Sequence, residues 1–250
     1  MLQLVQRYIT AVRILFIDLS ANNTAAKDIA MKRNASGRPT KKIITVCAVV
    51  CAAVLILAFG IFLWDKNRPD NLDYGYAREV PENEMALRQK LIGNAEAWLG
   101  TVKGSPEHRR LIDLYNAQEV LPVGYTVTYN DNWCATFVTA AALQSGIEDI
   151  IPPECGCQRQ IALFESMGRW QEDETYVPLP GDVIYYSRKG ALVGDNTGWS
   201  DHVGIVVGTS GDYIKVIEGN NRSSVRYRYV RKDNSTIRGY GLPDYSGKCN

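Results

Sequence analysis

The chain has 250 residues, a formal net charge of +1 and a hydrophobic content of 46%, so it is long enough to form a domain with a sizeable core. The first 64 residues hold 8 of its 28 basic and 2 of its 27 acidic residues, which leaves 20 basic and 25 acidic residues in the rest. This larger part is therefore slightly acidic and lacks a basic stripe, which argues against nucleic acid as a partner.

Residues 1–42 precede a long apolar segment and are predicted to be cytoplasmic. Apolar side chains recur there at helical spacing, which favours a helix lying on the inner membrane surface. These side chains are Leu4, Tyr8, Val12, Leu15 and Leu19. Met31, followed by Lys32 and Arg33, has the pattern of a natural protein start, so a second hypothesis is that translation begins there.

Residues 43–64 form an uninterrupted apolar stretch without a charge. At about 1.5 Å per residue, a helix of this length crosses a hydrocarbon core of about 30 Å, so we predict a transmembrane helix in the lipid bilayer. The flank before it is basic, whereas the flank after it mixes both signs. By the positive-inside rule, the amino end stays in the cytoplasm and the carboxyl part is exported from a single-pass cell-membrane anchor. A cleaved signal peptide is the alternative, because Ala58, Phe59 and Gly60 resemble a cleavage site.

Residues 65–84 mix Asp, Asn, Pro, Arg and Tyr with little apolar periodicity and are predicted to be an extracytoplasmic linker. Residues 85–250 then suit one domain. Its first half favours helices: an apolar stripe from Leu87 to Trp98, a helix capped by Ser105, a helix beginning near Cys134, and one from Gln158 to Met167.

From Gly181 onward the pattern changes to strands. The predicted strands are Val183 to Tyr186, Val203 to Val207, Tyr213 to Ile217, Val225 to Val230 and Ile237 to Tyr240. Helices followed by a meander of strands predict an α+β domain, in which N-terminal helices, one of them carrying Cys134, pack on an antiparallel sheet.

Cys134 lies in DNWCATFV, where Asp131 or Asn132 is predicted to cap a helix that Gly146 ends. In the first turn of a helix, free N–H groups and the helix dipole favour the thiolate, which is the form that attacks carbonyl carbon. The other interpretation of Cys134 is a small buried apolar residue.

His202 opens the apolar run of DHVGIVV and is one of only two histidines in the chain. A base that works on a thiol at neutral pH must therefore be His202 or His108. His108 is predicted to lie on the first turn of a solvated helix after Ser105 and Pro106, which favours His202.

Glu218 ends a strand in which it shares a face with Ile214 and Val216. A carboxylate at the end of an apolar face needs a partner, and a histidine N–H on the neighbouring strand would serve. Asn220, two residues on, either shares this orienting role or forms the turn. Glu218 itself has the alternative of merely ending a hairpin strand.

Four segments in this order resemble the CHAP family, the cysteine, histidine-dependent amidohydrolases/peptidases of the papain-like NlpC group. They are WCATFV, PLPGDVIYY, DHVGIV and IEGN, with RGYGLP closing the domain. The resemblance covers roughly residues 85 to 245. It implies cleavage of amide bonds in peptidoglycan, with Cys134 as nucleophile, His202 as base, and Glu218 and Asn220 as polar supports.

No metal or other cofactor is predicted, because the chain has no clear match to the acidic calcium-binding loop of some relatives. Besides Cys134, the predicted exported part has the cysteines Cys155, Cys157 and Cys249. At most one pair of these three can form a disulfide, and a bond between Cys155 and Cys157 would be strained. The sequence does not identify a protein partner.

Trp133 and Trp199 flank the nucleophile and the base, and are candidates to line a substrate cleft. The equal alternative is that they seal the core beneath the helix. The loop around Trp199, residues 194–200, is rich in turn formers and is a candidate substrate-shaping lid.

These features predict a peptidoglycan hydrolase, either an N-acetylmuramoyl-L-alanine amidase or a peptide endopeptidase, that works through a Cys134 thioester. The backbone N–H of Cys134 is expected in the oxyanion hole. The rival hypothesis is a catalytically silent, membrane-tethered wall-binding or scaffold component of a secretion or conjugation machine. A third is a protease or acyltransferase that acts on a substrate outside the wall.

Overall fold

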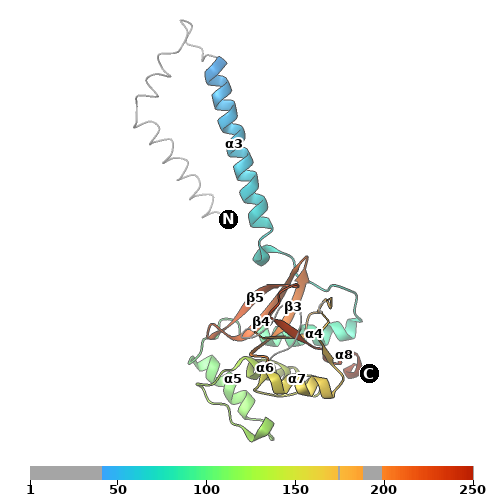
Figure 1. Ribbon diagram of the computed structural model, residues 1–250. Coiled ribbons are helices and arrows are strands. Elements are labelled where there is room, and N and C mark those ends of the chain that lie inside the picture. Colours follow the sequence, from blue (N-terminus) through green and yellow to red (C-terminus); the bar gives the residue numbers. More distant parts are fainter. Residues whose placement is uncertain (1–40, 174, 188–198, 250) are drawn as a thin grey trace. The chain divides into compact units, whose positions relative to one another are not determined.

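The computed structural model describes residues 41–173, 175–187 and 199–249, with side chains from Val50 onward. The predicted cytoplasmic segment, including Met31, and most of the candidate lid lie outside the described residues. The chain divides into two compact units, residues 1–67 and 68–250, which are considered separately (Figure 1).

The described part of the first unit is one helix, α3 (Lys41–Lys66). Its large apolar side chains are exposed at most positions from Val50 to Trp64. Among the residues whose side chains are described, no helix is long and apolar enough to cross a membrane. Residues 43–49 of the predicted span lie outside that part.

The second unit begins earlier than the sequence indicates, because part of the predicted linker contacts the rest of this unit. Gly75 exchanges backbone hydrogen bonds with Thr209, with N···O distances of 3.1 and 3.0 Å. The Tyr74 ring lies 5.6 Å from that of Tyr229. Arg78 donates to the carbonyl of Val177 at 2.9 Å. These contacts could not be predicted from the polar composition of the segment, because backbone groups and polar or aromatic side chains make them rather than an apolar stripe.

The predicted helices of this unit are confirmed, with shifted ends. They are α4 (Glu82–Glu96), α5 (Pro106–Asn116), α6 (Cys134–Ser145) and α7 (Cys157–Ser166). Ser105 caps α5 by accepting from the His108 N–H, and Gly146 ends α6 in the left-handed conformation, both as predicted.

The strands form one antiparallel sheet in the order β1-β6-β2-β3-β4-β5. The strands are β1 (Trp170–Gln171), β2 (Val183–Tyr186), β3 (His202–Ser210), β4 (Tyr213–Asn221), β5 (Ser224–Arg231) and β6 (Ile237–Gly241). The α+β prediction is confirmed. The pattern analysis missed β1 and three short helices: η1 (Pro69–Asn71), η2 (Pro122–Gly124) and α8 (Tyr245–Lys248).

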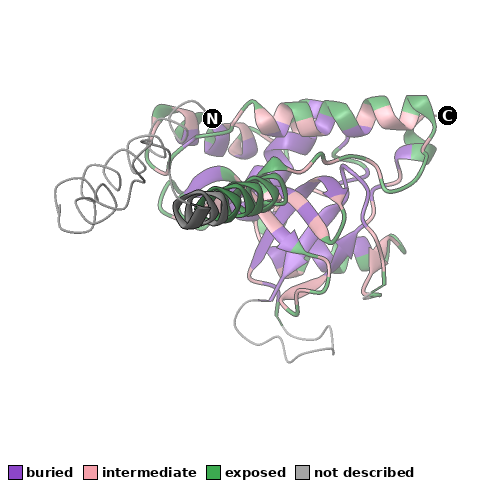
Figure 2. Ribbon diagram, turned by 90° about the horizontal axis from the view of Figure 1, so that it is seen from above, coloured by how far each residue is buried: buried purple, intermediate pink, exposed green. Residues whose placement is uncertain are grey.

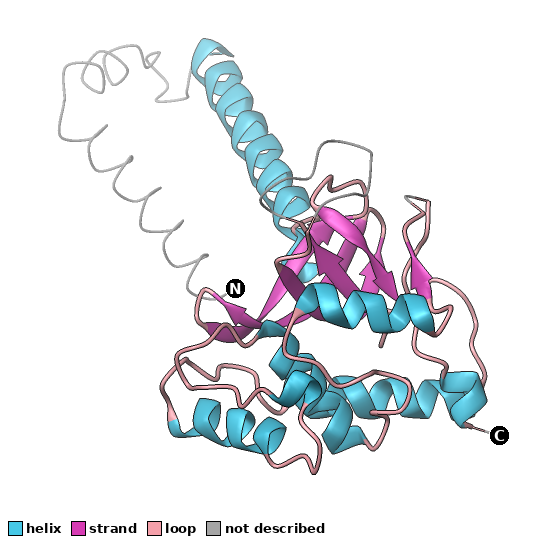
Figure 3. Ribbon diagram, turned by 60° about the horizontal axis from the view of Figure 1, so that its bottom comes forward, coloured by secondary structure: helices cyan, strands magenta, loops and turns pink. Residues whose placement is uncertain are grey.

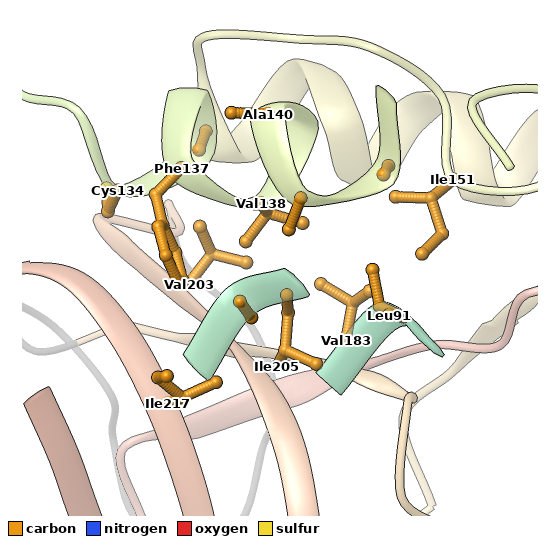
Figure 4. Packing of buried hydrophobic residues seen from close by; sticks show 14 of the residues in the cluster. Leu91, Cys134, Phe137, Val138, Ala140, Ile151, Val183, Val203, Ile205 and Ile217 are labelled. Carbon is orange, nitrogen blue, oxygen red and sulfur yellow. The ribbon is translucent and has the colours of Figure 1, made fainter. Parts of the chain in front are cut away.

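The helices of the second unit gather on one side of the sheet (Figure 3), and the sheet strands are mostly buried (Figure 2). Helix α6 packs directly on β3 and β4, so that Phe137 and Val138 face Val203 and Ile217 (Figure 4). The other sheet face carries a smaller apolar cluster that includes Tyr186, Val206 and Val216. Helix α6 is buried almost throughout because it fills the main core, which explains its nearly uniform apolar sequence.

The Asp182 side chain of the PLPGD segment joins helix α4 to the start of β2. Its Oδ1 accepts from Arg88 at 2.9 Å, and its Oδ2 accepts from the Tyr176 hydroxyl at 2.6 Å and the Leu179 N–H at 2.9 Å. Arg88 also pairs with Glu84 at 2.8 Å. Both oxygens of this buried carboxylate are therefore hydrogen-bonded, and Asp182 has a structural role.

Candidate active site

Cys134 lies in the first turn of α6, as predicted, where it is the first helical residue, and it is 6% exposed. The predicted capping by Asp131 or Asn132 is wrong, since the N-cap residue is Trp133 and makes no side-chain cap hydrogen bond. Asp131 instead accepts from the Thr128 N–H at 2.7 Å and the Tyr125 hydroxyl at 3.0 Å. The N-cap residue therefore leaves the first turn without a side-chain cap, and the Ala135 N–H helps to lower the pKa of Cys134.

His202 is the first residue of β3 and connects the cysteine to the carboxylate. One ring nitrogen, Nε2, lies 2.9 Å from Glu218 Oε2. The ring also lies near enough to the Cys134 sulfur for this sulfur to help raise the pKa of His202. Its face stacks on Tyr186, with ring centroids 5.9 Å apart. The structure thus brings together the three residues that the sequence predicts as nucleophile, base and orienting acid.

Glu218 lies in β4 and is almost fully buried. Its Oε2 accepts a second hydrogen bond from Asn221 Nδ2 at 2.9 Å. Its Oε1 has no hydrogen-bond partner among the described residues, and the nearest charge is Arg228 Nη1 at 3.8 Å. Because an ionised carboxylate only accepts, Nε2 carries the proton in this contact and Nδ1 remains for the thiol.

The carboxylate of Glu218 has room because Gly204 in the neighbouring strand lacks a side chain. A Cβ on Gly204 would lie 2.8 Å from Glu218 Cγ and 2.6 Å from a methyl of Val216. A second close approach fixes the strand to the helix, since a Cβ on Gly219 would lie 2.4 Å from Phe137 Cβ. The two glycines therefore bring the acid beside the histidine, and β4 against α6.

Cys134 and His202 shift each other's pKa values toward their charged forms, and Glu218 adds to the shift of His202. Burial by itself lowers the pKa of His202, but the hydrogen bonds and charges of Cys134 and Glu218 outweigh it and raise the pKa to about 9. The pKa of Cys134 is lowered well below its usual value, first by a hydrogen bond from Cys157 and then, against the opposing effect of burial, by His202. A thiolate beside an imidazolium ion is the form that these contacts favour.

Asn220 is not part of the orienting contact to the histidine. Its backbone has a φ of 54°, and its Nδ2 donates to Asn132 Oδ1 at 3.1 Å. It therefore links the end of β4 to the residues just before α6. Asn221, its neighbour, contacts Glu218 instead, and no local pattern distinguishes these two adjacent asparagines.

Trp133 is fully buried, and its ring packs at 4.8 Å against the ring of His108. This placement agrees with the alternative of a core residue and leaves no face of Trp133 for a substrate. His108 is buried as well, so its prediction on a solvated face is wrong. Burial lowers its pKa, and its Nδ1 accepts from the Gly104 N–H at 3.2 Å. Trp199, in contrast, is 75% exposed.

A cavity of about 400 Å³ is lined mainly by residues that precede α6 and α7 in the chain. Asn132, two residues before Cys134, forms part of its wall, and so does Gly156, which precedes Cys157. The remaining lining residues are Val123, Tyr125, Val127, Asp131, Cys155 and Arg159. The cavity thus combines apolar side chains with one acid and one base. Within the described part of the chain, no cluster of three or more His, Cys, Asp or Glu residues could hold a metal ion.

Sequence reasoning did not identify the second cysteine at the site. Cys157 is the first residue of α7, and its Sγ lies 3.6 Å from Cys134 Sγ. The described cysteines Cys51, Cys134, Cys155, Cys157 and Cys249 are all free. The Cys-Gly-Cys spacing was visible in the sequence, but only the fold shows which cysteine reaches the nucleophile.

Comparison with known proteins supports the resemblance seen in the motifs. No curated protein and no solved structure shows significant similarity to the chain. The model of the CHAP domain family matches residues 122–220, a segment that contains Cys134, His202 and Glu218. This segment of the chain is therefore similar to the CHAP domain, whose members are typically cysteine, histidine-dependent amidohydrolases or peptidases.

Proposed function

We propose that this protein is a cysteine amidohydrolase or peptidase that cleaves an amide bond of peptidoglycan. The observation that carries the proposal is the buried chain of contacts from Cys134 through His202 to Glu218. The similarity of residues 122–220 to the CHAP domain supports peptidoglycan as the substrate. Whether the bond joins muramic acid to L-alanine or lies within the peptide is the question that the experiment below addresses.

The mechanism follows from the ion pair. The Cys134 thiolate attacks the amide carbonyl carbon, and the carbonyl electron pair moves to oxygen. Protonated His202 then donates its proton to the leaving nitrogen, the C–N bond breaks, and a thioester remains on Cys134. Neutral His202 next removes a proton from water, which attacks the thioester and releases the acid and the thiolate. Glu218 holds the ring in the required tautomer throughout.

The developing oxyanion needs donors close to the sulfur. The first N–H groups of a helix have no partner within the helix, and the backbone N–H of Cys134 is one of them. We propose this group as an oxyanion donor, assisted by the positive end of the α6 dipole. The N-cap residue of α6, Trp133, makes no side-chain hydrogen bond to these N–H groups, which is consistent with this role.

The cavity beside Asn132 and Gly156 is our proposed substrate subsite. Its apolar residues suit the alanine side chains of a stem peptide, and its volume of about 400 Å³ suits a few residues of peptide. The guanidinium of Arg159 is held at 2.8 Å by Glu154, yet about half of its side chain remains exposed. It is therefore available to a substrate carboxylate.

We further propose that residues 43–64 anchor the protein in the cell membrane with the catalytic unit outside. The exposed apolar side chains of α3 from Val50 to Trp64 and the basic residues before it support this proposal. Protease treatment of intact cells tests it. Digestion of residues 68–250 is expected, and their full protection would contradict the exported orientation.

The test of the enzymatic proposal is digestion of purified peptidoglycan by the full-length protein, followed by mass spectrometry of the released fragments. An amidase releases free peptides and unmodified glycan, whereas an endopeptidase leaves shortened peptides on the sugar. Cys134→Ala is expected to reduce the rate by about 10³-fold or more, because the other site residues cannot replace the nucleophile. The matched control is Cys249→Ala, which removes a thiol outside the site and should leave the rate unchanged.

The same experiment separates the rival functions. A silent scaffold protein would release no fragments while still sedimenting with the wall. An enzyme with another substrate would also release none, but its Cys134 would react with iodoacetamide at mildly acidic pH, since the lowered pKa keeps the thiolate present there. Fragment release that persists undiminished in Cys134→Ala would refute the assignment of the nucleophile.

A further inference from the structure

The nucleophile has a second thiol as its neighbour. Cys157 Sγ lies 3.6 Å from Cys134 Sγ, and both side chains are buried, at 8% and 6% exposed. The hydrolytic mechanism does not use Cys157. A disulfide needs a sulfur–sulfur distance of about 2.0 Å, so the two atoms need to approach by only about 1.5 Å.

The segment before α7 is tied to α6, which keeps the two cysteines together. Thr139 in α6 donates to the Glu154 carbonyl at 2.8 Å and accepts from the Glu154 N–H at 2.9 Å. Farther along α7, Gln160 accepts from the buried Tyr185 hydroxyl at 2.8 Å. The contact between the sulfurs is thus set by two fixed pieces of backbone rather than by a loose loop.

The two thiols differ in protonation. The hydrogen bond between them lowers the pKa of Cys134 and raises that of Cys157, an effect that burial of Cys157 reinforces. These shifts favour the thiolate at Cys134 and the thiol at Cys157. The neighbouring Cys155 has different contacts, because its sulfur accepts from Arg159 at 3.4 Å. Position within the fold, not proximity in sequence, makes Cys157 the partner.

We propose that Cys157 is a resolving cysteine, which converts an oxidised Cys134 into a reversible Cys134–Cys157 disulfide when the protein meets hydrogen peroxide. The Cys134 thiolate attacks one peroxide oxygen, the O–O bond breaks, and the products are a sulfenic acid and hydroxide. The Cys157 sulfur then attacks the sulfenic sulfur, the S–O bond breaks, and water leaves with the thiol proton. In total, one thiolate and one thiol lose two electrons and one proton, and the peroxide becomes one water and one hydroxide ion.

Formation of the disulfide would therefore stop hydrolysis reversibly. The disulfide removes the nucleophile, so hydrolysis stops, and it also protects the sulfur from irreversible oxidation to the sulfinic or sulfonic acid. A thiol reductant restores both cysteines. The arrest of hydrolysis rests on the proposed function, whereas formation of the disulfide does not.

The experiment maps the cross-link in the full-length protein after treatment with hydrogen peroxide. Free thiols are blocked, and the protein is cut by a protease that cleaves after glutamate. Cleavage after Glu119 and Glu148 releases Cys134 in one peptide, and cleavage after Glu154 and Glu165 releases Cys155 and Cys157 in another. The expected product is these two peptides joined by a disulfide. In Cys155→Ser the same joined pair is expected, and this assigns the bond to Cys157.

Cys157→Ser and Cys157→Ala are expected to yield no joined pair, and Cys134 should instead gain two or three oxygen atoms. Wild-type hydrolysis, stopped by peroxide, should return on addition of dithiothreitol to within about twofold of the untreated rate, but not in either Cys157 variant. A joined pair that persists without Cys157, or wild-type Cys134 that is oxidised without any cross-link, would overturn the proposal. If the protein hydrolyses no wall, the cross-link map still decides this inference. If it hydrolyses wall and forms no cross-link, only the inference fails.

Discussion

Two buried carboxylates in the same compact unit, Asp182 and Glu218, differ in how they are hydrogen-bonded. Both oxygens of Asp182 accept hydrogen bonds, from Arg88, Tyr176 and the Leu179 backbone. Glu218 receives its two hydrogen bonds on Oε2 alone. Arg88 remains charged at all relevant pH values, whereas the histidine beside Glu218, whose pKa is raised to about 9, gains and loses a proton in the proposed reaction.

The difference shows how one residue type serves structure in one place and a candidate reaction in another. Both oxygens of Asp182 are hydrogen-bonded, and its charged partner Arg88 does not lose its proton. Asp182 therefore holds α4 to the sheet and is not available for a reaction. Glu218 is paired with a group whose charge must change during catalysis. Both residues belong to segments that carry the resemblance to the CHAP family, yet only the geometry separates the supporting acid from the functional one.

The largest effect is expected from His202→Gln. The Gln amide can still donate to Glu218, so the buried carboxylate keeps a partner and the protein should fold, but no base remains for the thiol. We expect hydrolysis of peptidoglycan to fall by about 10³-fold with little change in melting temperature. Rates of fragment release and thermal unfolding would be measured together. Residual activity within tenfold of wild type would remove His202 from the mechanism.

The second effect, on stability, is expected from Asp182→Asn. It removes one of the two carboxylates paired with buried Arg88 and leaves only Glu84, so it should lower the free energy of unfolding by about 3 kcal/mol. The matched control is Asp149→Asn, since Asp149 pairs with Lys248 at 2.7 Å on the surface, and its loss should cost less than about 1 kcal/mol. Denaturant titration measures both. Equal costs for the two variants would contradict the structural role of Asp182.

The smallest effect is expected from Glu218→Gln, about a tenfold loss of kcat/KM, because the ring stays in place but loses its charged support. The charge of Glu218 helps to raise the pKa of His202 to about 9, so its removal lowers that pKa. Protonated His202 must donate to the leaving amine. The activity loss at alkaline pH should therefore begin at lower pH in the variant, as a pH profile of kcat/KM would reveal, and an unshifted alkaline limb would count against the pairing.

Much of this fold could be predicted from local patterns. The cap of α5 at Ser105, the end of α6 at Gly146 and the extent of β2 follow from helix-end and strand signals. The pairing of His202 with Glu218 was also predictable, because a buried acid at the end of an apolar strand face needs a partner.

The missed features depend on contacts between distant residues. Cys157 meets Cys134 only because α7 packs beside α6, and no spacing in the sequence encodes this. Asn220 and Asn221 are chemically identical neighbours, so only the backbone turn decides which one contacts Glu218. The segment around Gly75 joins the sheet through backbone groups, which side-chain patterns do not report. The burial of His108 against Trp133 likewise results from packing, while its local sequence looks solvated.

Gly204 and Gly219 take no part in the reaction, yet the reaction depends on both, because neighbouring atoms leave no space for a side chain at either position. A single added methyl group at either position would meet the acid or the helix at less than contact distance. Alanine at Gly204 would push the carboxylate off the ring, and alanine at Gly219 would separate the strand from the thiol. In a survey of inactivating substitutions, these two glycines should therefore rank beside Cys134, His202 and Glu218, although neither has a side chain.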